Sequence, residues 1–169
     1  GLEFPAFGPQ TTQDLAQALP PIATVSNPLD YTTPIWGQPK FTGPVFQKAI
    51  DPAQVDAAIL VQDYPAPGLD ESKVYYQNDA RAFAVAAQMA DIPAAICATL
   101  PENIDAGTRV FLINSGVAPM QGIHETLIAV AHAADWKRQR QKILASPTPP
   151  LQAAQTLGVV QLINEADGK

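Results

Sequence analysis

Two short stretches and one histidine carry the residue types that could do chemistry in this sequence. The first stretch is Asn27-Pro28-Leu29-Asp30-Tyr31-Thr32, which sets an amide, a carboxylate and a hydroxyl among turn-forming residues. Asn, Asp, Thr and Pro favour turns because their side chains bond the local backbone or fix φ. We therefore expect a loop of one fixed shape. Its Asn27, Pro28, Asp30 and Thr32 are candidates for the wall of a substrate site; the alternative is that Asn27 and Asp30 only tie a turn together.

The second stretch is Asp63-Tyr64, which directly follows the apolar run DAAILVQ at residues 56–62. That run predicts a buried parallel strand. In open parallel sheets ligands meet the loops at the carboxyl ends of the strands, so Asp63 is a candidate site residue. His124 is the third candidate, since it stands beside Glu125 at the start of a predicted helix. The simpler interpretation is that Asp63 is a structural loop carboxylate and His124 a polar residue of a first helical turn.

Metal and nucleophile chemistry find little support in the sequence. His124 and His132 stand eight residues apart, too far for both to bind one metal directly, and no carboxylate–histidine pattern accompanies them. Cys97 lies inside the apolar run AAICA, where a buried core cysteine is expected rather than a reactive thiolate. The sequence contains no nucleotide P-loop, no G-x-G-x-x-G and no G-x-S-x-G motif. We therefore predict no metal site and assign no catalytic residue.

The elements that must position these residues follow from apolar runs and from the Pro, Gly and Asn residues between them. Short apolar runs alternate with longer helical patterns, which favours an α/β fold with a parallel sheet and helices on both faces. The run at 110–113 could be a strand, but Asn103 as a cap and Gly116 as a stop favour a helix. The expected helices are 11–19, 43–50, 71–90, 103–115 and 123–144, and the expected strands are 22–25, 56–62, 94–98 and 117–120.

Composition excludes several classes of protein. The 169 residues carry a net charge of −6, so binding to a nucleic-acid backbone is not expected. The apolar runs are shorter than the roughly 20 residues that span a bilayer, and we expect no membrane partner. The first residues show no secretory signal, and the single cysteine excludes an internal disulfide, which together predict a reducing cytoplasm.

An ordered set of short segments resembles one enzyme family. The segment from Leu15 to Thr33, which contains Leu19-Pro20-Pro21 and Asn27-Pro28-Leu29-Asp30, is similar to an "lP…NPvDlTg" stretch of nucleoside-diphosphate-forming acyl-CoA synthetases, the ADP-forming acetate–CoA ligase relatives of succinyl-CoA synthetase. Further similar segments follow in the family's order. They are Gly1–Pro5, Val55–Val61, Ile92–Ile96, Gly116–Pro119, His124–Ala134 and Ile163–Lys169.

The resemblance implies a fold, a reaction and partners. Residues 1–146 would be the second flavodoxin-like ligase domain, and residues 147–169 a Pro-rich linker and the start of an ATP-grasp segment. The family joins a carboxylic acid to CoA with ATP and Mg through an acyl phosphate and a phosphohistidine. The remaining CoA-binding, phosphohistidine and ATP-grasp parts would be partners, and a homo-oligomer is expected. This chain itself would hold no cofactor.

Departures from the family pattern limit the role of this chain. The family's phosphohistidine motif does not occur here, so neither histidine inherits that role. The resemblance also implies a missing first strand and helix, and a strand absent from the middle of a sheet leaves an open edge. We therefore expect either a contact from another chain or an upstream piece at that edge. The leading hypothesis is a domain that supports the ligase chemistry; the alternative is a non-catalytic oligomerisation or regulatory binding module.

Overall fold

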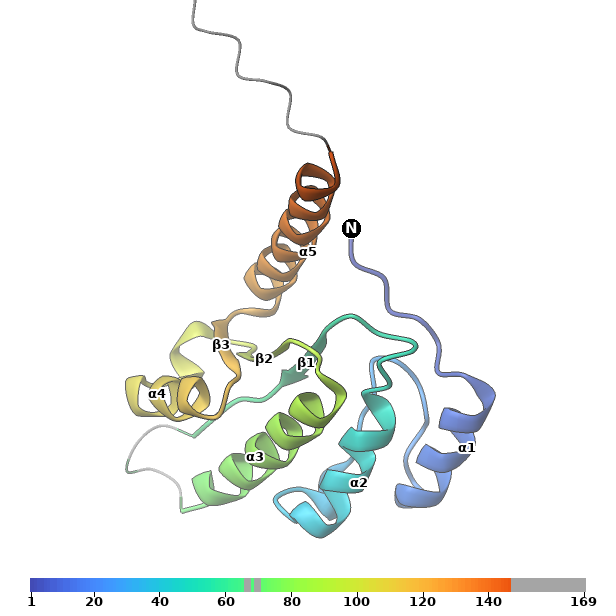
Figure 1. Cartoon of the computed structure of the whole chain (residues 1–169). Coiled ribbons are helices and arrows are strands. Elements are labelled where there is room, and N and C mark those ends of the chain that lie inside the picture. The colour runs from blue at the N-terminus through green and yellow to red at the C-terminus, as the bar shows by residue number, and fades with distance from the viewer. Residues whose placement is uncertain (66–67, 69–70, 147–169) are drawn as a thin grey trace, which may run out of the picture. The chain divides into compact units, whose positions relative to one another are not determined.

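The computed structural model describes residues 1–65, 68 and 71–146 (Figure 1). The chain divides into two units, the first of residues 1–134 and the second beginning at Asp135. The predicted linker and the segment after it, residues 147–169, lie outside the described residues. The elements are α1 (Pro9–Ala18), η1 (Thr33–Ile35), α2 (Pro39–Ala49), β1 (Ala58–Val61), α3 (Lys73–Ala90), β2 (Ala94–Ala98), η2 (Pro101–Asn103), α4 (Ala106–Asn114), β3 (Ala118–Gln121) and α5 (Ile123–Ala145).

The three strands of the described chain form an open parallel sheet in the order β1-β2-β3. Leu60 lies opposite Ile96, which in turn lies opposite Pro119. Each pair of neighbouring strands is joined through a helix, α3 between β1 and β2 and α4 between β2 and β3. The predicted α/β class with a parallel sheet is therefore confirmed.

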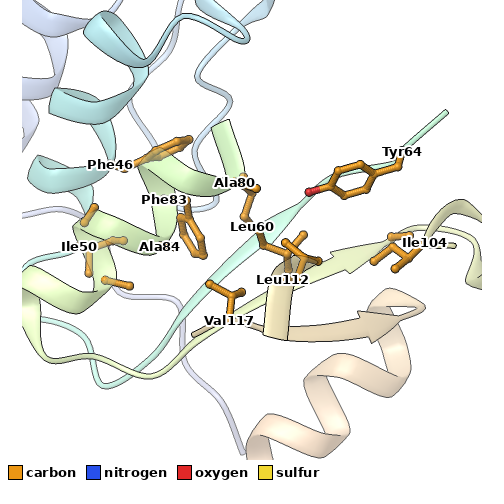
Figure 2. Close-up of a cluster of buried hydrophobic side chains, with 14 residues drawn as sticks. Phe46, Ile50, Leu60, Tyr64, Ala80, Phe83, Ala84, Ile104, Leu112 and Val117 are labelled. Atoms are coloured by element: carbon orange, nitrogen blue, oxygen red, sulfur yellow. The ribbon is translucent and has the colours of Figure 1, made fainter. Parts of the chain in front are cut away.

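The main core lies between one face of this sheet and the helices α2, α3 and α4 (Figure 2). Leu60 and Ile96 point to this face, where they meet Phe83 of α3 and Leu112 of α4. Phe46 of α2 packs edge-on against Phe83, with ring centroids 5.6 Å apart. Each such side chain stabilises the fold by roughly 1.5–3 kcal/mol when it is fully buried. Leu60 and Ile96 share this face because they are paired across β1 and β2 and side chains alternate along each strand.

The opposite face of the sheet is covered at β2 by the start of α5 but is more exposed at β1. Ala95 and Cys97 of β2 point to it and are buried. Thr126, in the first turn of α5, lies against the Cys97 thiol. On β1 the same face is more open, because Val61 is 47% exposed.

A second, smaller core holds the N-terminal part of the chain. It joins α1 to α2 and to the loop that precedes α2, through four buried side chains: Leu15, Leu19, Ile35 and Val45. The predicted helix at 11–19 is thus confirmed as α1. Its apolar residues pack on α2 rather than on the sheet.

Three sequence expectations differ from the structure. Residues 22–25 form no strand; Ala23 closes a turn with Pro20, and Ala23 and Val25 pack on the second core. A strand forms only beside a pairing neighbour, and β1 does not reach this segment. Helix α2 begins at Pro39 instead of Gly43, which places Pro44 inside it, and α4 is capped by Asp105 instead of Asn103.

Among the residues that the structure describes, we find no helix with the length and apolarity that a membrane crossing requires.

Candidate functional site

The loops at the carboxyl ends of the strands are held together by Asp63. Its Oδ1 accepts hydrogen bonds from the Thr99 backbone N–H at 2.8 Å and from Asn103 Nδ2 at 3.0 Å. Its Oδ2 accepts the Thr99 hydroxyl at 2.7 Å. Burial raises the pKa of Asp63, but the bonds from Thr99 and Asn103 outweigh it, and the pKa lies below its usual value. Asp63 therefore joins the loop after β1 to the loop after β2 as a stable carboxylate.

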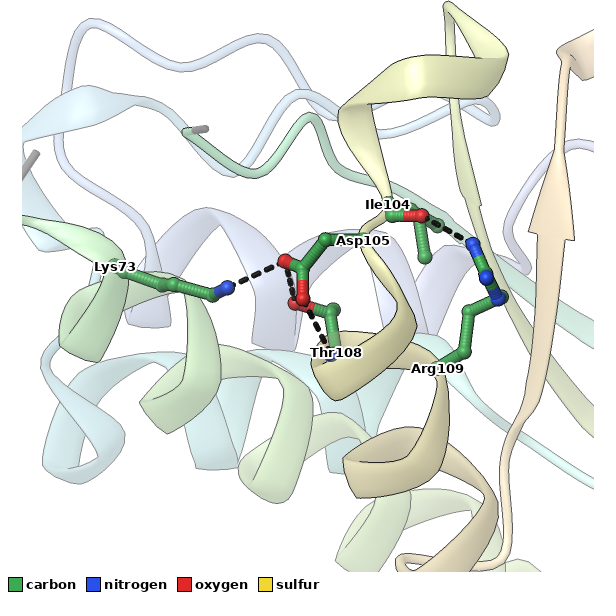
Figure 3. Close-up of polar contacts among 5 residues, drawn as sticks. All are labelled: Lys73, Ile104, Asp105, Thr108 and Arg109. Carbon is green, nitrogen blue, oxygen red and sulfur yellow. Dashed lines mark hydrogen bonds and ion pairs between the residues drawn. The ribbon is translucent and has the colours of Figure 1, made fainter. Parts of the chain in front are cut away.

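A second polar cluster joins the N-terminal ends of α3 and α4 (Figure 3). Asp105 is the residue before α4 and accepts the Thr108 N–H at 3.1 Å and the Thr108 hydroxyl at 2.6 Å. Lys73, the first residue of α3, donates to Asp105 Oδ2 at 2.5 Å. The bond from Lys73, followed by those from Thr108, holds the pKa of Asp105 well below its usual range. A negative charge here also faces the positive end of the helix dipole.

The predicted site loop is tied at three points. Asn27 Nδ2 donates to the carbonyl of Pro5 at 2.9 Å, so the amide reaches back to the first residues of the chain. The Ser26 hydroxyl donates to the carbonyl of Pro28 at 2.8 Å, and the Asn27–Pro28 peptide bond is cis. Asp30 Oδ1 accepts the Thr32 N–H at 2.8 Å, and Thr32 adopts a left-handed φ of 61°. These contacts are those of a loop held in one shape.

Asp79 is a buried carboxylate that the sequence reasoning missed. It lies on α3, is 1% exposed, and accepts the Gly37 N–H at 2.9 Å, the Thr42 hydroxyl at 3.0 Å and the Tyr31 hydroxyl at 3.3 Å. Burial raises its pKa more than these three donors lower it. The signal in the sequence was an aspartate four residues before Phe83, on the buried side of the helix.

Asp79 also holds Gly37, at the end of the loop that precedes α2, against α3. Gly37 has a φ of +69°, and a Cβ added there would lie 2.4 Å from the Tyr75 Cβ, so only glycine fits. Trp36 and Tyr75 both remain exposed beside this contact. The Tyr31 and Trp36 rings lie 6.1 Å apart. The loop before α2 thus carries aromatic side chains on a backbone that the buried Asp79 holds in place.

The structure does not bring all predicted site residues together. Within the described part of the chain, no hydrogen bond or ion pair joins Asp63 or His124 to the loop of Asn27, Pro28, Asp30 and Thr32. His124 is exposed in the first turn of α5. The described residues also contain no group of three His, Cys, Asp or Glu side chains that could hold a metal ion.

A shallow hollow of about 460 Å³ lies elsewhere, between the start of α1 and the end of α2. Its polar groups are engaged with one another. Gln54 Oε1 accepts the Gly8 N–H at 2.9 Å, and Lys48 lies 4.0 Å from Asp14. None of the predicted site residues lines this hollow.

No protein-family model matches this chain, and neither does any curated protein.

The residues at the carboxyl ends of the strands are arranged to hold loops in place rather than to make or break bonds. Cys97 is buried, and burial raises the pKa of its thiol, which disfavours a nucleophilic thiolate. The carboxylates Asp63 and Asp105 already accept several hydrogen bonds each. Such groups fix the shape of the loops that a ligand or a second protein segment would meet.

Proposed function

We propose that this chain is a flavodoxin-like domain of an acid–thiol ligase, which forms an acyl-CoA from a carboxylic acid, CoA and ATP. In this proposal the domain frames the site of a phosphohistidine that another part of the enzyme carries. The loop of Asn27, Pro28, Asp30 and Thr32 forms one wall of that site. As the resemblance implies, ATP, Mg and CoA are assigned to the remaining parts of the ligase.

The observation that carries the proposal is the outer edge of β1, beside which no strand of the described residues lies. The N–H groups of Ala58 and Gln62 bond to β2, so by alternation those of Ile59 and Val61 point away from the sheet. The strand reads Ala-Ile-Leu-Val and contains none of the charges or prolines that normally protect an edge. The other edge is different, because β3 contains Pro119.

An unprotected apolar edge favours a further strand beside β1. The ligase resemblance calls for a strand at this position, followed by a glycine-rich helix start that would hold a phosphoryl group on its N–H donors. A segment of the ligase outside residues 1–169 would supply it. The partly exposed Val61 and the less covered face of β1 would then be buried.

The first test is phosphorylation of the polypeptide that carries this chain together with the other ligase parts. Incubation with γ-labelled ATP and Mg should give an acid-labile, base-stable phosphoprotein that acid plus CoA, or ADP, discharges. Residues 1–169 alone should stay unlabelled. Absence of label on the folded larger polypeptide would refute the ligase function.

A second test addresses the loop. Asp30→Ala removes the acceptor for the Thr32 N–H and should lower acyl-CoA formation with the fold kept. Asp56→Ala is the matched control, because Asp56 is an exposed aspartate at the start of the β1 segment. Equal turnover in both variants would reduce the loop to a structural turn.

The second candidate function is an oligomerisation or regulatory binding module. It is favoured by the exposed Trp136, Ile143 and Leu144 on the last turns of α5. A polypeptide that carries this chain and forms a stable dimer, but is neither phosphorylated by ATP nor affected by CoA or nucleotide, would support this function over the ligase.

A further inference from the structure

The charge of this chain is divided unevenly along the sequence. Residues 1–134 contain thirteen Asp and Glu against five Lys and Arg, a formal charge of −8. Residues 135–146 contain four Lys and Arg against one Asp, a formal charge of +3. The end of α5 is therefore a basic segment on an otherwise acidic chain.

The same segment carries a patch of exposed side chains. Trp136 is 66% exposed and Ile143 is 72% exposed, and their spacing of seven residues puts them on one face of the helix. The Arg140 guanidinium lies over the Trp136 ring at 5.9 Å, on the same face. Trp and Arg are the residue types that most often dominate protein interfaces.

We infer that this basic segment, residues 135–146 at the end of α5, docks on the acidic body of a second copy of this chain. The docking does not depend on the proposed ligase function. Pairing of two α5 segments with each other would bring two charges of +3 together and is disfavoured. A lipid surface fits less well, because the basic side chains are not separated from the apolar ones: Arg140 lies in the middle of the face of Trp136 and Ile143.

The complementary surface is the edge of the body where the helices α2, α3 and α4 end. These three C-termini carry partial negative charge; Asp51 stands just beyond the end of α2, and Asp91 is the C-cap of α3. Lys48, the cation in the last turn of α2, lies 4.0 Å from Asp14 and is thus partly neutralised.

Apolar side chains accompany these charges. Met89 in the last turn of α3 is 71% exposed, and Ile113 in the last turn of α4 is 62% exposed. Gln88 Nε2 donates to the Ser115 carbonyl at 3.2 Å and so connects the ends of the two helices. Trp136 and Ile143 of one copy would contact Met89 and Ile113 of the other, with Lys142 near Asp91.

The test is self-association of the full chain by analytical ultracentrifugation. We expect a dimer whose dissociation constant rises at least tenfold when NaCl is raised from about 50 to about 500 mM, because exposed ion pairs are screened. Trp136→Ala and Lys142→Glu should each weaken the dimer at least tenfold. Lys40→Glu, an equal charge change on an exposed lysine of the body, should leave it within threefold of the unchanged chain.

Charge exchange tests the complementary surface. Asp91→Lys combined with Lys142→Glu should restore the dimer toward the unchanged affinity. A chain that stays monomeric at about 100 µM in low salt, or a dimer that Lys142→Glu does not weaken, would overturn the inference. If the charge exchange does not restore the dimer, the proposed contact of Lys142 with Asp91 of the other copy is wrong. Circular dichroism confirms that every variant is folded.

Discussion

The contact of Asp105 with Lys73 and Thr108 allows a quantitative prediction about stability. Asp105→Asn keeps an acceptor at the N-cap of α4 but removes the charge that Lys73 meets at 2.5 Å. Asp105→Ala removes both. An N-cap contributes typically about 1 kcal/mol, and a partly exposed ion pair up to about 1 kcal/mol. At pH 7 we expect losses of about 0.5–1 kcal/mol for Asp105→Asn and about 2 kcal/mol for Asp105→Ala.

The effect of Asp105 depends on pH in a defined direction. The folded-state pKa of Asp105 is lowered from the ordinary value of 3.8, chiefly by the bond from Lys73. The unfolded chain therefore binds the proton more readily, and folding stability falls as the pH drops below about 4. The asparagine variant cannot lose this contribution. The difference in unfolding free energy between the unchanged chain and Asp105→Asn should accordingly shrink between pH 6 and pH 2.5.

Urea unfolding followed by far-ultraviolet circular dichroism, repeated across this pH range, measures that difference. Asp56→Asn is the control, since Asp56 is exposed, and its difference should stay within about 0.5 kcal/mol at every pH. A difference for Asp105→Asn that stays constant from pH 6 to pH 2.5 would refute the assigned charge contact. An alanine variant no less stable than the asparagine variant would refute the capping role.

Three further predictions concern the loop anchors. Asp79→Ala removes the acceptor of two buried donors, the Gly37 N–H and the Thr42 hydroxyl, and of the partly buried Tyr31 hydroxyl. It should cost about 2–4 kcal/mol in urea unfolding, and a loss below about 1 kcal/mol would contradict the anchor. Gly37→Ala places a Cβ 2.4 Å from that of Tyr75 at a φ of +69° and should lower the thermal midpoint clearly; an unchanged midpoint would argue against the close contact. Asp63→Ala should speed hydrogen exchange at the Thr99 amide at least tenfold, and unchanged exchange would show that Asp63 does not hold that loop.

Local sequence patterns were sufficient to place most elements. The apolar runs at 56–62 and 94–98 are short and bounded by turn residues, which is typical of buried parallel strands, and they contain β1 and β2. The segment at 103–115 was ambiguous by periodicity. The stop signal Gly116 correctly favoured a helix, which the structure shows as α4, although its cap is Asp105 and not Asn103. These patterns succeed because they reflect interactions within a few residues of one another.

The contacts that hold the candidate site were decided by tertiary structure alone. Asp79 meets Gly37 across 42 residues, and Asp63 meets Thr99 across 36, and no local pattern records such partners. The segment 22–25 has the composition of a strand, but no neighbouring strand pairs with it. Residue types and spacing therefore determined where helices and strands could form. Which polar groups meet, and which edge of the sheet stays open, depended on how distant segments pack, because hydrogen bonds and strand pairs need a partner at the right distance.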